Sequence, residues 1–241
     1  MKALGLSCMK YSLGPLLRLQ GQHVRKRTPT LPEPSGDRTG QVGRGQQLRL
    51  LILGDSSAAG VGVADQQAGL LGHILQALKP EYKIDYELRA YTGAKTRDCL
   101  ADLNHAINNE WHSNGLFDVV VTALGVNDVT GQLSLKKWRK QQRSLIEMVH
   151  NRLQPQVLIV SGLPPMHRFP ALPVPLRSYL GAWARLFNQN LQQLSSQYTN
   201  TTYIAVSDLP QPLDVASDGF HPGPITYQRW GQAVAELIKH R

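Results

Sequence analysis

The chain has 241 residues, of which 41% are hydrophobic and 18% charged, a composition typical of a folded domain. Its net charge of +9 is unevenly distributed: residues 1–49 hold nine Lys/Arg and two acids, whereas the rest holds seventeen Lys/Arg and fifteen acids. Because the body of the chain lacks a strong basic excess, we expect no nucleic-acid partner. Two cysteines, Cys8 and Cys99, form neither a disulfide framework nor a metal-ligand pattern.

The N-terminal 46 residues show no sustained hydrophobic period. Residues 11–24 contain scattered leucines that suit a short amphipathic helix, the basic cluster Arg25-Lys26-Arg27 follows, and residues 28–45 are rich in Pro, Gly and Thr, which predicts an extended linker. The only early apolar run, residues 3–6, is shorter than the about 7–15 residues of a signal-peptide core. No stretch approaches the roughly 20 apolar residues of a membrane span. We expect a cytoplasmic protein, with peripheral membrane contact through this basic segment as an open alternative.

From residue 48 onward, short apolar runs alternate with segments of helical period. The strands are predicted at residues 50–53, 82–91, 118–124, 156–161 and 202–206. The helices are predicted at residues 66–78, 96–111, 134–153, 177–198 and 225–239. Five strands that alternate with helices predict a parallel sheet with helices on both faces. We therefore expect two parts, a basic segment and linker over residues 1–46 and an α/β domain over residues 47–241.

Small and polar residues follow several of the predicted strands. Ser56 comes directly after the first strand, Gly93 after the second and Asn127 after the third, while Asp218 and His221 share the loop after the fifth. Because the carboxyl ends of parallel strands meet at one edge of the sheet, we expect these residues to lie close together.

These residue types suit nucleophilic catalysis. A serine hydroxyl attacks an ester only when a base takes its proton, and His221 is the candidate base, oriented by Asp218. The oxyanion then needs fixed donors, for which the candidates are the Ser56 N–H, the Gly93 N–H and the Asn127 side-chain amide. Two alternatives remain at this point. Ser56 alone could cap a helix, and Asp218 with His221 could bind a metal, although no third ligand stands near them in the sequence.

The four blocks together resemble the SGNH hydrolase superfamily, also called GDSL esterases or lipases, whose name lists a Ser, a Gly, an Asn and a His in separate blocks. Here these are Ser56 in Gly54-Asp55-Ser56, Gly93, Asn127 in Gly125-Val126-Asn127-Asp128, and His221 three residues after Asp218. Ser57 stands where the family name has Leu, a position that is not catalytic. The resemblance covers about residues 48–240, and the loop over residues 162–170 is similar to a bacterial, esterase-like branch.

The resemblance implies a three-layer α/β/α sandwich with a five-stranded parallel sheet in flavodoxin-like order, and hydrolysis of esters or thioesters without a cofactor or a metal. We therefore expect a serine hydrolase that cleaves small-molecule carboxylic esters, lysophospholipids or thioesters through an acyl-Ser56 intermediate. The alternatives are a carbohydrate acetylesterase and, in another class, a non-catalytic membrane-peripheral binding protein on the same fold. Short to medium acyl chains are expected because the loops are modest and no large lid domain is evident. His167 and Arg168 are candidate residues at the edge of the pocket.

Overall fold

The structure is a computed structural model that describes residues 3–111, 117–209 and 214–240. Its centre is a sheet of six strands in the order β1-β3-β2-β4-β5-β6. The strands are β1 (Thr39–Gly43), β2 (Gln46–Gly54), β3 (Tyr82–Ala90), β4 (Val119–Ala123), β5 (Val157–Ser161) and β6 (Thr201–Ile204). Strands β2 to β6 are parallel, and their order along the sheet is the flavodoxin-like one.

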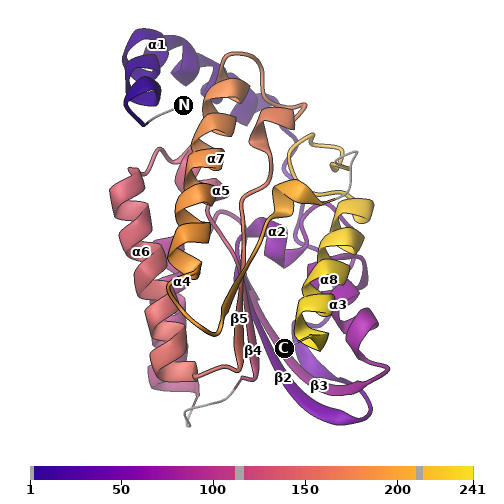
Figure 1. The fold of residues 1–241 in the computed structure, drawn as a ribbon. Helices are drawn as coiled ribbons and strands as arrows, with labels where there is room; N and C mark the ends of the chain where they lie inside the picture. Colours follow the sequence, from indigo (N-terminus) through magenta and orange to yellow (C-terminus); the bar gives the residue numbers. More distant parts are fainter. Residues whose placement is uncertain (1–2, 112–116, 210–213, 241) are drawn as a thin grey trace.

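Helices cover both faces of this sheet (Figure 1). One face carries α3 (Leu70–Leu78) and α8 (Pro224–Lys239), and the other carries α4 (Thr96–His105), α6 (Leu135–Met148) and α7 (Leu176–Ser195). Two short α-helices follow strands, α2 (Ser56–Ala59) and α5 (Val126–Thr130). Single 3₁₀ turns lie at Gln66–Ala68, Met166–Arg168 and Val206–Asp208. Helices α4 and α6 each continue into a π-helical turn, at Ala106–Glu110 and Val149–Leu153. The predicted three-layer α/β/α fold is thus confirmed.

The central strands show why the apolar runs predict the fold well. Every residue of β4 and β5 is buried, because helices cover both faces of a parallel sheet. Two hydrophobic cores result, one on each side of the sheet. On the α4–α6–α7 side, Trp138 of α6 stacks on Phe187 of α7 with ring centroids 4.1 Å apart, which joins these two helices.

The sheet differs from the predicted one at its edge. The segment expected as an extended linker contains β1, which pairs antiparallel with β3 and brings the strand number from five to six. The sequence of β1, Thr-Gly-Gln-Val-Gly, lacks apolar alternation, and only Val42 is partly buried. This strand exists because an edge of β3 is available to pair with it. The proposed domain boundary at residue 47 stays a prediction.

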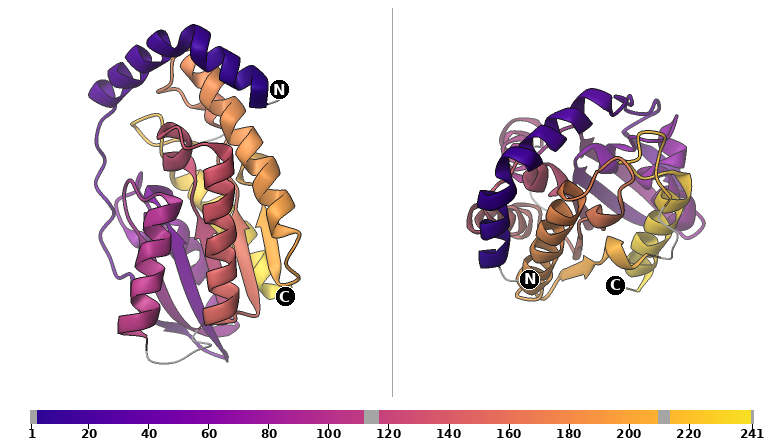
Figure 2. Two further views of the ribbon diagram at one scale, coloured as in Figure 1. Left: turned by 90° about the vertical axis from the view of Figure 1, so that its left-hand side faces the viewer. Right: turned by 90° about the horizontal axis from the view of Figure 1, so that it is seen from above.

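The N-terminal helix is longer than expected. Helix α1 (Ala3–Arg27) lies across the end of the molecule at which the parallel strands end (Figure 2). Its buried residues Leu6 and Leu17 belong to the core on the α7 side. The Gln20 side chain donates to the carbonyl of Val174 (2.9 Å) and accepts from the N–H of Leu176 (3.1 Å). A helix that an isolated sequence pattern supports weakly is therefore held by tertiary contacts.

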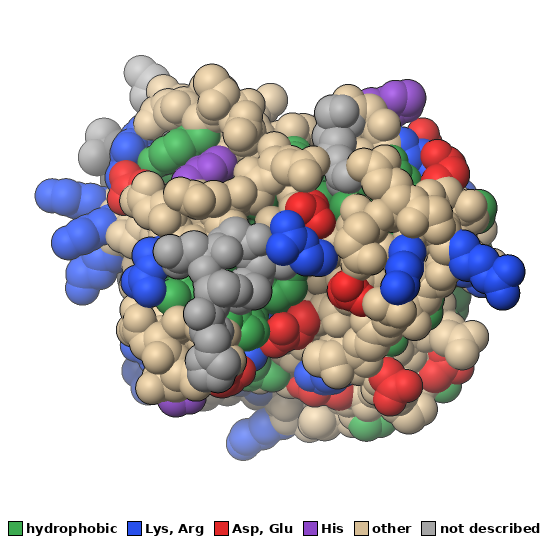
Figure 3. Space-filling view, turned by 90° about the horizontal axis from the view of Figure 1, so that it is seen from below, with side chains coloured by type: hydrophobic (Ala, Val, Ile, Leu, Met, Phe, Trp, Pro, Cys, Tyr) green, Lys and Arg blue, Asp and Glu red, His purple; other side chains and the backbone are tan. Residues whose placement is uncertain are grey.

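The charges differ between the two ends of the molecule. Helix α1 contains five Lys/Arg and no Asp or Glu. At the opposite end, Figure 3 shows Lys and Arg side chains mixed with Asp and Glu. Within the described residues, no helix is both long enough and apolar enough to span a membrane.

Candidate active site

The turn after β2 holds Ser56 close to the sheet. Gly54 ends the strand, and a Cβ at this position would lie 2.2 Å from the Cβ of Ala58, so only glycine lets α2 turn back onto the strand. Asp55 caps α2 by accepting from the N–H of Ser57 (2.9 Å), as a residue of the turn. Complete burial raises the pKa of Asp55 to about 6. Ser56, the first residue of α2, is 7% exposed.

His221 lies between Ser56 and Asp218. The distances are 2.9 Å from His221 Nε2 to Ser56 Oγ and 2.5 Å from His221 Nδ1 to Asp218 Oδ2. The other oxygen of Asp218 accepts from the backbone N–H groups of Phe220 (2.9 Å) and His221 (3.0 Å). Burial pushes the pKa of Asp218 upward, but the hydrogen bonds from the His221 ring and these two N–H groups outweigh it, so the pKa lies below its ordinary value.

These bonds determine the tautomer of His221. Asp218 is ionised at neutral pH because its pKa is lowered, and a carboxylate only accepts hydrogen bonds. The Nδ1–H of His221 therefore donates to Asp218, and Nε2 of the neutral ring is free to accept from the Ser56 hydroxyl. Gly62 packs against the loop that carries His221. It has φ +114°, and a Cβ there would lie 2.3 Å from the carbonyl oxygen of Pro222, so this close contact requires glycine.

The two further predicted donors lie on neighbouring loops that touch. Gly93 follows β3 with φ +84°, and a Cβ added at this residue would meet no atom within 4 Å, so its backbone faces open space. Asn127 lies in α5, after β4, and its amide donates to the carbonyl of Ala94 (3.0 Å). An amide NH₂ carries two hydrogens, so the second remains for an oxyanion.

Asp128 is buried and links the turn that carries Asn127 to helix α4 through hydrogen bonds. Its Oδ2 accepts from the backbone N–H (3.1 Å) and the hydroxyl (2.7 Å) of Thr96, at the start of α4. Gln142 of α6 donates to the same hydroxyl (2.9 Å). Burial raises the pKa of Asp128 despite these bonds. The network ties α5 to α4 and α6, and thereby fixes the turn that carries Asn127.

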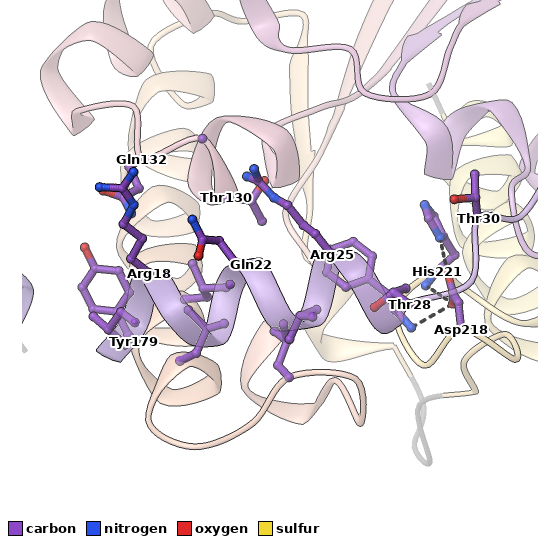
Figure 4. A pocket seen from close by; sticks show the side chains of 18 of the residues that line it. Arg18, Gln22, Arg25, Thr28, Thr30, Thr130, Gln132, Tyr179, Asp218 and His221 are labelled. Carbon is purple, nitrogen blue, oxygen red and sulfur yellow. Dashed lines mark hydrogen bonds and ion pairs between the residues drawn. The ribbon is translucent and has the colours of Figure 1, made fainter. Parts of the chain in front are cut away.

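Two cavities adjoin His221. A small one of about 40 Å³ also contacts Ser56 and is otherwise mostly apolar, with Val126, Phe169 and Trp230 among its walls. A large one of about 850 Å³ extends from His221 beneath α1. Figure 4 shows Arg18, Gln22 and Arg25 of α1 along this large cavity, with Asp218 and His221 at one end of it.

The large cavity gives the N-terminal segment a place beside the site. Helix α1 and residues 28–31 form one wall of it, a role that the sequence pattern did not indicate. The signal that was available is the spacing of Gly14, Leu17 and Gly21, which places small and apolar residues on one helical face. His167 and Arg168 are not among the described residues that line either cavity, and the ring of His167 lies 3.3 Å from Arg185.

The structure thus brings Ser56, His221 and Asp218 into hydrogen-bonding contact and places Asn127 and Gly93 on adjoining loops. A family model described as "GDSL-like Lipase/Acylhydrolase family" matches residues 52–229. Comparison with curated protein sequences gave no match. Both α1 and β1 lie outside the matched residues.

Several solved structures are similar to the chain. The lipase Lip_vut3 from a goat rumen metagenome is 18% identical with a TM-score of 0.63, and the match covers 78% of this chain and 96% of that one. Est24, a carbohydrate acetylesterase from Sinorhizobium meliloti, is 17% identical with a TM-score of 0.63 over 80% and 99% of the two chains. An aryl esterase from M. smegmatis is 16% identical with a TM-score of 0.62 over 80% and 99%. Identities this low show a common fold.

Proposed function

Because the chain belongs to the GDSL-like lipase/acylhydrolase family, we propose that it is a serine hydrolase that cleaves carboxylic esters through an acyl-Ser56 intermediate. The observation that carries the proposal is the continuous chain of contacts from Ser56 Oγ through His221 to Asp218, at 2.9 Å and 2.5 Å. A helix-capping serine needs no such partner, and a metal site would not direct His221 Nε2 at a hydroxyl.

In the proposed reaction, Ser56 Oγ attacks the acyl carbonyl carbon while His221 Nε2 takes the hydroxyl proton. The carbonyl electrons move to oxygen, which the N–H groups of Ser56 and Gly93 and the Asn127 amide stabilise. When the tetrahedral intermediate collapses, His221 returns the proton to the leaving alcohol or thiol. Water then attacks the acyl-Ser56 ester by the same route and releases the acid. Asp218 stays ionised and stabilises the imidazolium of His221.

The two cavities suggest how the ester is oriented. The cavity beside Ser56 has about 40 Å³, enough for roughly three water-sized probes at about 10–15 Å³ each, which suits an acetyl-sized acyl group. The 850 Å³ cavity on the other side of His221 suits a larger leaving group. This difference favours a short acyl chain, and it keeps a carbohydrate acetylesterase as the second candidate, in keeping with the acetylesterase among the structural neighbours.

Hydrolysis of 4-nitrophenyl esters tests this proposal. We expect wild type to cleave the acetate faster than the octanoate and Ser56→Ala to be inactive, while Ser196→Ala, an exposed serine at the end of α7, behaves as wild type. Equal turnover by wild type and Ser56→Ala would contradict the mechanism and favour the non-catalytic alternative. A preference for octanoate would contradict the assignment of the small cavity.

Membrane-peripheral contact is a second proposal, carried by exposed leucines on α1. Leu16 is 43% and Leu19 63% exposed, and the exposed Lys26 and Arg27 follow on the same helix. We expect co-sedimentation with anionic phosphatidylserine vesicles that is lost in Leu16→Gln/Leu19→Gln. These substitutions are preferable to removal of residues 1–46, because that removal would also delete β1 and a wall of the large cavity. No co-sedimentation of wild type would end this proposal.

A further inference from the structure

The face of α1 that borders the large cavity carries two arginines. Arg18, Gln22 and Arg25 stand at positions i, i+4 and i+7, which places them on one side of the helix. In the view of Figure 4, Arg18 points towards Gln132 and Arg25 towards Thr130, and all four residues line the cavity. The charges thus lie in the same cavity as His221.

The guanidinium groups of Arg18 and Arg25 differ in their ion pairing from the arginines near the sheet. Arg38 binds Glu33, Arg49 binds Asp118, and Arg89 binds three carboxylates. Arg18 and Arg25, in contrast, make no ion pair or hydrogen bond with any described residue. The one acid among the described residues lining their cavity is Asp218, whose two oxygens are already bonded. The cavity therefore has a net positive charge without an internal partner.

The helix also leaves room beside these charges. Gly14 and Gly21 face the same cavity, and a Cβ at either position would meet nothing within 4 Å. Glycine inside a helix costs about 1 kcal/mol relative to alanine, so helix stability does not explain them. A solvated basic helix face would need neither the glycines nor the apolar residues Leu17, Val24 and Leu176, which line the same cavity.

We propose that Arg18 and Arg25 bind a phosphate group carried by the ester substrate, on the part of the substrate that lies under α1. The inference rests on the proposed function and specifies its substrate class: a short-chain ester whose leaving group is amphiphilic and anionic. Guanidinium groups bind phosphate oxygens in a bidentate manner, and the apolar wall suits the hydrocarbon part between the phosphate and the ester. Because α1 lies outside the residues that the family model matches, this site is a feature of this chain's own N-terminal helix.

Calorimetric titration with hexyl phosphate tests the site without requiring turnover. We expect the full-length protein to bind hexyl phosphate, and Arg18→Gln and Arg25→Gln each to weaken binding by about tenfold or more, the typical loss for a hydrogen bond to a charged group. Arg27→Gln is the matched control: it removes the same charge from the last turn of α1 but does not line the cavity, so its affinity should stay within about twofold of wild type.

A second readout connects the site to the reaction. Hexyl phosphate should inhibit 4-nitrophenyl acetate hydrolysis competitively, hexan-1-ol should inhibit much less, and Arg25→Gln should raise the inhibition constant of hexyl phosphate alone. Equal weakening by Arg27→Gln and Arg25→Gln would show general charge attraction and overturn the proposal, as would the absence of hexyl phosphate binding. If the wild-type protein binds hexyl phosphate but does not hydrolyse 4-nitrophenyl acetate, the serine-hydrolase mechanism is overturned, whereas the proposed anion site is not. Matching thermal unfolding of all variants confirms that each is folded.

Discussion

The two walls of the large cavity are built differently. On the His221 wall, both oxygens of Asp218 accept hydrogen bonds, and Gly62 packs behind the His221 loop against the carbonyl of Pro222. On the α1 wall, Arg18 and Arg25 make no ion pair with a described residue, and Gly14 and Gly21 border empty space. The first wall is preorganised for chemistry, because a reacting geometry tolerates little displacement. The second offers charge and volume, which are properties that select a ligand.

The largest expected effect concerns the paired wall. His221→Gln should lower kcat/KM for 4-nitrophenyl acetate by about 10⁴-fold or more, because Ser56 then lacks its base. His167→Gln serves as the control and should keep wild-type activity, because the His167 ring contacts Arg185 and lines neither cavity. A similar loss in both variants would show that the effect comes from folding and not from proton transfer.

Asn127→Ala comes next. It removes one candidate oxyanion donor, and we expect kcat to fall by about 10²- to 10³-fold with little change in KM, because the donor acts in the transition state. Asn190→Ala, whose amide bonds only to its own helix at the carbonyl of Leu186, is the matched control. A rise in KM with unchanged kcat would instead place Asn127 in ground-state binding.

Asp55 offers a stability test with a defined pH dependence. Its pKa is about 6 in the folded protein and about 3.8 when solvated, so folding favours the protonated form and stability falls as pH rises between these values. Asp55→Asn keeps the cap on Ser57 and removes the buried charge. We expect it to be more stable than wild type at pH 8, by on the order of 2–3 kcal/mol, and similar at pH 3.5. Urea unfolding at both pH values measures this, and an equal difference at both would contradict it.

The smallest expected effects are changes in stability on replacing two glycines, Gly62 and Gly21, by alanine. Gly62→Ala should destabilise the protein by about 2 kcal/mol, because it forces a side chain into a left-handed backbone 2.3 Å from the carbonyl of Pro222. Gly21→Ala should stabilise it by about 0.5–1 kcal/mol, because the helix is regular there and the added methyl meets open space. Opposite shifts in the midpoint of thermal unfolding support the contrast between the walls. Shifts of the same sign would show that α1 is as tightly packed as the His221 loop.

The strands and the site blocks were predictable for one physical reason. A buried parallel strand must be apolar throughout, so runs such as Val119–Ala123 and Val157–Ser161 predict their positions to within a residue or two. The same rule places the residues after each strand at one edge of the sheet. The prediction that Ser56, His221 and Asp218 lie together required nothing more than this topology.

Other elements could not be read from local pattern. Strand β1 has the composition of a turn and forms because β3 offers an edge. Helix α1 contains Pro15, Gly14 and Gly21, which weaken its intrinsic preference for helix. It is held by Leu17 and by hydrogen bonds between Gln20 and residues more than 150 positions away. Contacts between residues so far apart in the sequence produce no hydrophobic period in either segment, so the sequence pattern does not predict them.

The sequence by itself therefore determined the layered α/β fold and the set of residues that could act on an ester, because burial and strand topology act through residue type and order. Only the tertiary structure decided that α1 lies across the strand ends, how large the space beneath it is, and which of its charges line the cavity that also contains His221. Those features depend on how distant surfaces fit together. They also bear most directly on which substrate the proposed hydrolase would accept.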